Sequence, residues 1–152
     1  MQIDDIDRRI LRYLQAEPSL STAELAEKAR IPAATCWRRL EKLNQIGAYK
    51  GQEAVIDWAA LGYSVEVSLR VTLDKTEPRA FDDFIEAARE VPEVLEIQTF
   101  LGRVDVRLNI LARDMAHYQH VYRSQILTLP HIADIEALMQ IATIKTAKGL
   151  PL

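Results

Sequence analysis

The sequence has little cysteine, no long apolar run and no excess of positive charge, and each shortage narrows the possibilities. Cys36 is the only cysteine, which excludes an internal disulfide and a zinc site built from several cysteines and is typical of a reducing compartment. No apolar run approaches the roughly 18 residues of a membrane span, and the N-terminus MQIDDIDRR is too acidic for a signal peptide. We therefore expect a cytoplasmic protein that has no membrane partner.

The charge balance is unusual for a nucleic-acid-binding protein. The formal net charge is −3, whereas proteins that bind DNA usually have a basic balance. Residues 28–50 nevertheless carry six basic side chains against Glu41 alone, a local charge of +5. Such a patch can bind phosphate groups on an acidic protein, although a solvated helix face would give the same cluster.

The length of 152 residues allows one ordinary domain or two small ones, and the 49% apolar content is sufficient for a real core. We place a domain boundary at Gly62, after the turn-like segment 57–62. Residues 1–62, which end in this hinge, and residues 63–152 are then predicted to fold as two separate domains.

Three short helices are predicted in the first sixty residues. Asp4 can cap the first helix, and Ser21 with Glu24 forms a capping box for the second. The third begins near Pro32 and runs to Ile46, with Leu40, Leu43 and Ile46 facing inward and Gly47 as its C-cap. Helix, tight turn and longer helix over 21–51 indicate a helix-turn-helix, whose second helix enters the DNA major groove.

The outward face of the third helix supplies candidate contacts to double-stranded DNA. In a recognition helix, N-terminal residues reach base edges, and Arg or Lys side chains fix the register on phosphates. Trp37 could pack on the sugar-phosphate backbone or cover the junction between helices. Cys36 lies at the inward spacing of a buried small residue. The candidates are Ala33, Ala34, Thr35, Trp37, Arg38, Arg39 and Lys42, with Lys50 on an expected extended wing over 49–56.

The second half predicts an antiparallel sheet with two helices. Apolar and polar residues alternate over 63–73, which is the clearest strand pattern in the chain. A helix follows Pro78 and has Phe81, Phe84, Ile85 and Ala88 on one side. Two strands come next, 94–101 and 104–111, and the chain reverses between them at Gly102-Arg103. Asp114 caps a second helix, and a last strand follows Pro130. This is the α+β class with βαββαβ order and both helices on one face. A second copy could cover the other face, giving a dimer with two recognition helices.

The order and spacing of several short motifs resemble the Lrp/AsnC (leucine-responsive/asparagine-regulator) family of transcription regulators over essentially the whole chain. The motifs are Asp4 to Leu11, Glu24-Leu25-Ala26-Glu27, Thr35 to Leu40 with Leu43 and Gly47, Leu61-Gly62, Val91-Pro92-Glu93-Val94, Gly102 with Asp105, and Leu129-Pro130.

The resemblance implies an N-terminal winged helix-turn-helix and a ferredoxin-like βαββαβ domain of the RAM or ACT type. It also implies dimers that can assemble into octamers, and an amino-acid effector bound near the loop Leu101-Gly102-Arg103-Val104-Asp105. Family members often have an acidic residue where this chain has Arg103, whereas Asp105 matches. An acidic group can hold a ligand's ammonium and an Arg its carboxylate, or the two residues can form an inter-subunit salt bridge.

The turn before the third helix differs from the family pattern. Arg30 and Pro32 stand where a glycine and an N-capping serine are usual. A positive φ at Arg30 costs a non-glycine residue about 1 kcal/mol. We expect the motif to form despite this cost.

Two other functions compete with a sequence-specific regulator. One is an enzyme on the same scaffold, similar to tetrapyrrole decarboxylases, for which His117 and His120 at helical spacing would be the acid/base or metal candidates. The surrounding sequence supplies no evident partner for them, so we expect no catalytic site, metal or cofactor. The other is a DNA-architectural protein that binds with little specificity.

Overall fold

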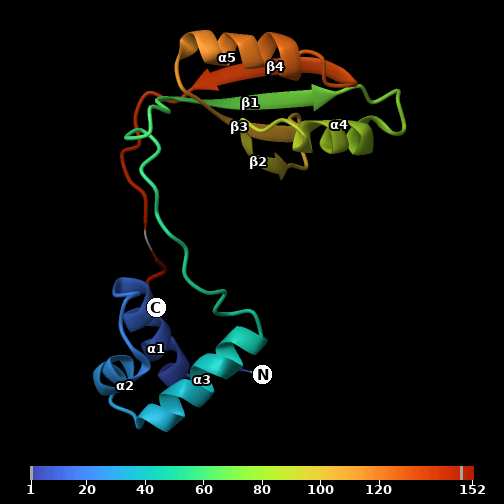
Figure 1. The fold of residues 1–152 in the computed structure, drawn as a ribbon. Helices are drawn as coiled ribbons and strands as arrows, with labels where there is room; N and C mark the ends of the chain where they lie inside the picture. The colour runs from blue at the N-terminus through green and yellow to red at the C-terminus, as the bar shows by residue number, and fades with distance from the viewer. Residues whose placement is uncertain (1, 148) are drawn as a thin grey trace. The chain divides into compact units, whose positions relative to one another are not determined.

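A computed structural model describes residues 2–147 and 149–152 of the chain. The chain forms two compact units (Figure 1), and each is described by itself. The helical unit comprises the residues up to Val55 together with the segment after Thr143, and the sheet unit comprises Ile56–Thr143. No helix among the described residues has the length and apolar content to cross a membrane.

Capping side chains begin the first two helices, as predicted. Helix α1 (Asp5–Ala16) starts with a reciprocal pair in which Asp4 Oδ1 accepts from Asp7 N–H at 2.9 Å and Asp7 Oδ2 accepts from Asp4 N–H at 3.1 Å. Helix α2 (Thr22–Ala29) has the same arrangement, because the Ser21 hydroxyl accepts from Glu24 N–H and the Glu24 carboxylate accepts from Ser21 N–H.

Helices α2 and α3 (Ala33–Gln45) end in the same hydrogen-bonded motif. Ile31 N–H donates to Ala26 O at 3.0 Å after α2, and Ala48 N–H donates to Leu43 O at 2.9 Å after α3, which are the six-to-one bonds of a Schellman motif. The motif requires one residue in the left-handed backbone conformation. Gly47 takes it with φ 73°, and Arg30 takes it with φ 56°, so the predicted positive φ at Arg30 is confirmed.

The core of the helical unit consists of aliphatic and small side chains. Its buried members include Ile10, Leu25, Cys36 and Leu43, and Ala26 and Ala29 let α2 lie close to its neighbours. The prediction that Ile46 faces inward is wrong, since its side chain is 46% exposed. Ile46, and not the predicted Gly47, is the C-cap of α3; its ψ of 0° takes the chain out of the helical path.

The expected wing is not a strand. The structure assigns no strand to residues 49–56, and the Val55 side chain is 97% exposed. The turn predicted for 57–62 is present, because Leu61 N–H and Tyr63 N–H both donate to Trp58 O.

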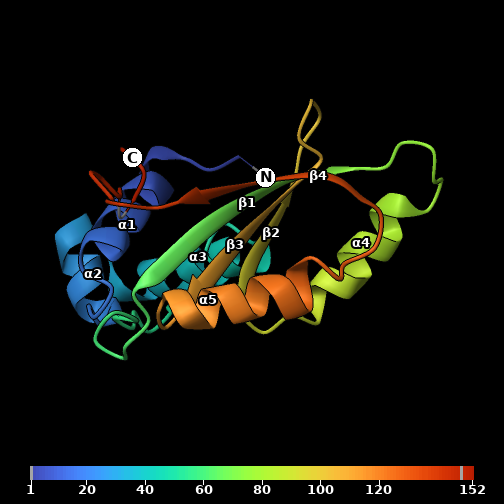
Figure 2. The ribbon, with the colours of Figure 1, turned by 90° about the horizontal axis from the view of Figure 1, so that it is seen from above.

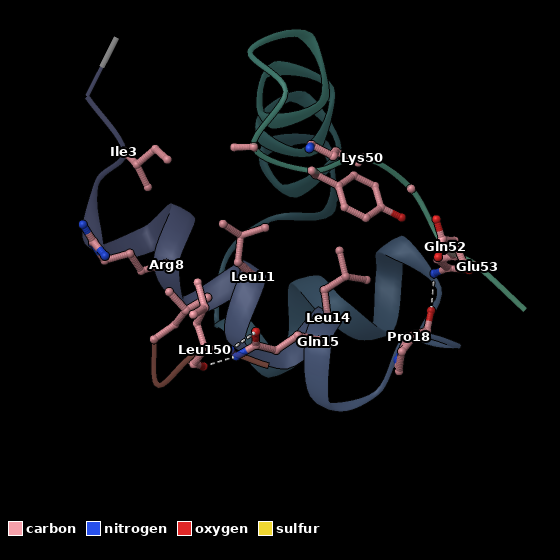
Figure 3. Close-up of a pocket in the computed structure, with 14 residues that line it drawn as sticks. Ile3, Arg8, Leu11, Leu14, Gln15, Pro18, Lys50, Gln52, Glu53 and Leu150 are labelled. Atoms are coloured by element: carbon pink, nitrogen blue, oxygen red, sulfur yellow. Dashed lines mark hydrogen bonds between the residues drawn. The ribbon is translucent and has the colours of Figure 1, made fainter. Parts of the chain in front are cut away.

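The end of the chain lies against α1, a contact that the sequence did not predict. Gln15 Nε2 donates to Leu150 O at 2.5 Å, and Leu150 N–H donates to Gln15 Oε1 at 3.0 Å, as the dashed lines in Figure 3 show. Arg12 Nε also donates to Leu152 O. A pocket of about 600 Å³ opens between this segment, α1 and residues 48–53.

The sheet unit has the predicted βαββαβ order. Its elements are β1 (Val65–Leu73), α4 (Ala80–Arg89), β2 (Val94–Thr99), β3 (Val106–Ala112), α5 (Met115–Val121) and β4 (Ile132–Met139). Helix α5 continues as a π-helical turn, Tyr122–Ile126, which was not predicted. The strands are antiparallel in the order β2-β3-β1-β4 and lie side by side in Figure 2.

One apolar core joins both helices to one face of the sheet. Alternate residues of β1 and β3 are buried together with Phe84 of α4 and with Val121 and Ile126 of the second helical segment. The prediction that Phe81 faces this core is wrong, because its side chain is 47% exposed and the buried row of α4 is Ala80, Phe84 and Ala88. The other face of β1 carries Glu66, Ser68, Arg70 and Thr72.

Candidate nucleic-acid interface and ligand pocket

The outer surface of α3 exposes most of the predicted DNA-contact residues. Thr35 and Arg39 are half-buried, and Trp37 is 59% exposed beside a small pocket that Thr22 of α2 also lines. Burial raises the pKa of the Cys36 thiol, in keeping with an inert core residue. The exposed candidates are Ala33, Ala34, Trp37, Arg38, Lys42 and Lys50.

Arg39 differs from its neighbours because two carboxylates of the same unit bind its guanidinium. Its Nη1 lies 2.8 Å from Asp4 Oδ2 and 2.8 Å from Asp7 Oδ1, and the Asp7 side chain is only 5% exposed. Hydrogen bonds to Asp7 and Asp4 raise the pKa of Arg39, so the group stays charged. The two carboxylates also cap α1, and this network therefore fixes α3 against the start of α1.

The ion pairs decide which basic groups of the patch remain available. Lys28 Nζ lies 2.5 Å from Glu17 Oε1, and Arg39 is bound as described. Within residues 2–147 and 149–152, no ion pair involves Arg30, Arg38, Lys42 or Lys50. Four cationic side chains without a carboxylate partner thus lie at the turn before α3, on α3 and in the segment that follows it.

The loop between β2 and β3 lines a separate pocket of about 470 Å³. Leu101, Gly102, Arg103 and Val104 line it, as the predicted effector site requires. Three further lining residues were not predicted: Phe100 at the end of β2, Arg70 of β1 and Arg107 of β3. The alternating patterns of β1 and β3 had already placed both arginines on polar faces of strands that the βαββαβ order makes neighbours, so this signal was present in the sequence.

Asp105, the remaining predicted effector residue, does not line this pocket. Its Oδ2 accepts from Leu73 N–H at 2.8 Å, and its Oδ1 pairs with Lys75 Nζ. The backbone hydrogen bond, with a smaller effect of Lys75, lowers the pKa of this carboxyl. Asp105 therefore ties the loop to the end of β1, and no carboxylate is among the residues that line the pocket.

The histidines do not form a metal-type cluster. His117 Nε2 lies 3.3 Å from Glu93 Oε1, and His117 Nδ1 accepts from Arg113 N–H at 3.1 Å. His120 lies on the exposed side of α5. Among the residues that the structure describes, no three His, Cys, Asp or Glu side chains are placed to hold a metal ion.

The pocket of about 600 Å³ in the helical unit is lined by no residue of α3. It is formed by α1, residues 48–53 and the end of the chain, and Figure 3 shows Leu11, Leu14 and Leu150 in its wall. Of the predicted DNA contacts only Lys50 lines it. Its lining is mostly apolar and belongs to the packing of the last residues on α1.

Comparison with known proteins covers both units. The family model described as winged helix-turn-helix DNA-binding matches residues 3–47, and the Lrp/AsnC ligand binding domain matches residues 66–150. The chain is 31% identical over 131 residues to the proline dehydrogenase transcriptional activator of Rhodobacter capsulatus, covering 86% of this chain and 85% of that protein. It is 27% identical over 151 residues to the glutamate uptake regulatory protein of Zymomonas mobilis, covering 99% of this chain and 92% of that protein.

Solved structures show the same architecture. A transcriptional regulator of Neisseria meningitidis in complex with L-Met superposes with a TM-score of 0.89 at 26% identity, covering 99% of this chain and 97% of that one. AsnC of Escherichia coli superposes with a TM-score of 0.84 at 26% identity, covering 98% of this chain and all of the other. The relatives are transcriptional regulators and not enzymes. The chain belongs to the Lrp/AsnC family: it is a DNA-binding transcriptional regulator with a helix-turn-helix domain and a ligand-binding domain of the AsnC type.

Proposed function

We propose that the protein regulates transcription by binding a specific operator with α3, as a dimer whose affinity for DNA responds to an amino acid. The observation that carries the proposal is the set of basic groups around α3 that have no carboxylate partner among the described residues: Arg30, Arg38, Lys42 and Lys50. A surface that binds phosphate needs unpaired cations, because a guanidinium that is already paired with two carboxylates is neutralised by them.

The roles on α3 follow from exposure and from position along the helix. Ala33, Ala34 and Thr35 occupy its first turn, where small side chains allow close approach to base edges and thymine methyl groups. Arg38, Lys42 and Lys50 bind phosphates, and Trp37 packs beside them. Arg39 acts as a positioning residue, because it orients α3 through Asp4 and Asp7.

The proposal assigns DNA binding and self-association to different parts of the chain. In this proposal residues 1–62 bind DNA and provide the hinge, and residues 63–152 bind the effector and self-associate. The face of the sheet opposite α4 and α5 is available for a second copy, and dimers can assemble further into octamers. A two-fold dimer presents two α3 helices to a pseudo-palindromic operator. Such a regulator acts in the cytoplasm.

The effector site of the proposal is the pocket at residues 101–104, with Asp105 supporting the loop. The Neisseria meningitidis regulator was solved as a complex with L-Met, which supports an amino acid as the kind of ligand. Arg103 is the residue of the loop that can bind a ligand carboxylate.

DNA titrations of single variants test the assignment on α3. Arg38→Ala and Lys42→Ala should each weaken binding to the protein's own promoter by about tenfold, and each should reduce the salt slope by about 1, because each removes one phosphate-binding cation. Lys28→Ala is the matched control, because Lys28 is already paired with Glu17. Equal losses for all three variants, or no loss for any, would remove the proposed interface.

A further inference from the structure

Two arginines of neighbouring strands stand directly opposite each other on the sheet face that the helices leave uncovered. Arg70 of β1 pairs in register with Arg107 of β3, next to Gln98 of β2 and Glu136 of β4 in the same row. Like charges at directly opposed positions destabilise an antiparallel pair. The fold therefore retains a local repulsion that an anion would relieve.

A third guanidinium and an apolar wall complete the same pocket. Arg103 enters from the loop between β2 and β3, and the Arg107 guanidinium carbon lies 5.9 Å from the centre of the Phe100 ring. Leu101 and Val104 add apolar surface. The volume of about 470 Å³ is in the range of sites for small molecules.

Neighbouring acidic groups do little to compensate the arginines. Glu136 Oε2 is 3.9 Å from Arg70 Nη1, and both side chains are at least half exposed, so solvent weakens this pair. The Asp105 carboxylate is already bound to Leu73 N–H and to the Lys75 ammonium group. The pocket thus presents three permanent positive charges and an apolar wall, with no carboxylate in its lining.

We propose that this pocket selects a small dicarboxylate, either an acidic amino acid or the corresponding 2-oxo acid. The inference rests on the proposed effector function and names its ligand class. Planar guanidinium groups bind carboxylates in bidentate fashion, so two carboxylates on a short carbon chain match arginines on two strands and the loop. Phe100 and Leu101 pack against the carbon chain. A neutral amino acid would satisfy one guanidinium and leave the repulsion between Arg70 and Arg107.

Calorimetric titration of the full chain tests this selectivity. The probes are L-glutamate and 2-oxoglutarate as dicarboxylates, L-glutamine and L-methionine as neutral amino acids, and inorganic phosphate as a simple anion. At least one dicarboxylate should bind tenfold or more tightly than every other probe. Arg103→Gln and Arg107→Gln should each weaken it at least tenfold, whereas Arg113→Gln, an exposed arginine outside the pocket, should leave it unchanged. Comparing L-glutamate with 2-oxoglutarate shows which source of dicarboxylate is used.

The failures of the two proposals are distinguishable. Tighter binding of a neutral amino acid would overturn the dicarboxylate inference and leave the amino-acid effector standing. Phosphate binding as tightly as the dicarboxylates would mean that the pocket holds anions without selection, and would also overturn the inference. If no probe binds, both the inference and the effector part of the proposed function fail, while DNA binding is tested separately.

Thermal denaturation without ligand gives a second readout. Arg107→Gln should raise Tm, because it removes the repulsion of Arg70. A fall in Tm would mean that Arg70 and Arg107 do not repel each other in the ligand-free protein, and would overturn the proposal.

Discussion

The helical unit and the sheet unit are stabilised by different kinds of contact. In the helical unit the buried apolar side chains are aliphatic or smaller, and polar contacts at helix ends complete the fold: two capping boxes, two Schellman motifs and the bonds of Arg39 to Asp4 and to the buried Asp7. In the sheet unit, both helices pack on one face of the sheet around an apolar core. This core includes Phe84 and alternate residues of β1 and β3.

The difference bears on function. The orientation of α3 depends on the bonds of Arg39 to Asp4 and Asp7 as well as on its buried residues, so a substitution away from its exposed face can change it. The sheet unit depends on buried apolar area, so substitutions on its open face, including those in the arginine pocket, leave its core intact. The following predictions test this contrast, beginning with the largest effect.

Removing the buried ring of Phe84 should have the largest effect on stability. Phe84→Ala should destabilise the sheet unit by about 4 kcal/mol, because it removes buried apolar surface and leaves a cavity. Hydrogen exchange read by mass spectrometry should show reduced protection in β1 and β3 and little change in α1 to α3. Phe81→Ala, at a side chain that is 47% exposed, is the matched control and should change little. An equal reduction of protection in α1 to α3 would contradict separate stabilisation of the two units.

Arg39 and Arg38 are adjacent on α3, but only the loss of Arg39 should lower the stability of the helical unit. Arg39→Ala leaves the buried Asp7 carboxylate without its cation and should cost about 2 kcal/mol. Arg38→Ala should stay within about 0.5 kcal/mol of the wild type. Urea unfolding followed by far-ultraviolet circular dichroism measures both. Similar costs for the two variants would show that the Arg39 network does not stabilise the unit.

The two Schellman motifs predict effects of opposite sign. Arg30→Gly should stabilise the helical unit by up to about 1 kcal/mol, since glycine adopts φ 56° without a steric cost. Gly47→Ala should destabilise it by about 1 kcal/mol, because alanine is strained at φ 73°. Thermal unfolding of the two variants beside the wild type measures the pair. A shift in the same direction for both would contradict the shared geometry.

Protonation of Asp105 in acid should produce a smaller effect, in the sheet unit. The pKa of Asp105 is lowered in the folded chain, so its carboxylate contributes stability above its ordinary pKa of about 4, and this contribution disappears as pH falls through the lowered value. Unfolding by guanidinium at pH 6 and pH 3 should show a smaller acid loss for Asp105→Asn than for the wild type. An identical acid loss would mean that the Leu73 and Lys75 contacts do not favour the charged form.

Local patterns in the sequence were sufficient for much of the fold. The alternation over 63–73 predicted β1, and the capping residues Asp4, Ser21 and Asp114 marked the starts of α1, α2 and α5. These features depend on neighbours within a few residues, which is why they can be read from the chain. Periodicity was less reliable at the margins of a helix: Ile46 and Phe81 have the right spacing but lie at the end or edge of the buried row.

Contacts between distant residues could not be read in the same way. The Arg39 network joins residues more than thirty positions apart, and nothing in the spacing separates Arg39 from Arg38. Asp105 has hydrogen-bond partners at the end of β1, which only the register of β1 and β3 reveals. The opposition of Arg70 and Arg107 likewise follows from that register, although the βαββαβ succession of elements was predicted.

The most direct test of the central claim is the affinity of the wild-type protein for its own promoter and for scrambled DNA of equal length at the same salt concentration. A regulator that reads bases with α3 should prefer the promoter by at least about a thousandfold. Equal affinity for the two DNAs would contradict sequence-specific regulation and would favour an architectural role.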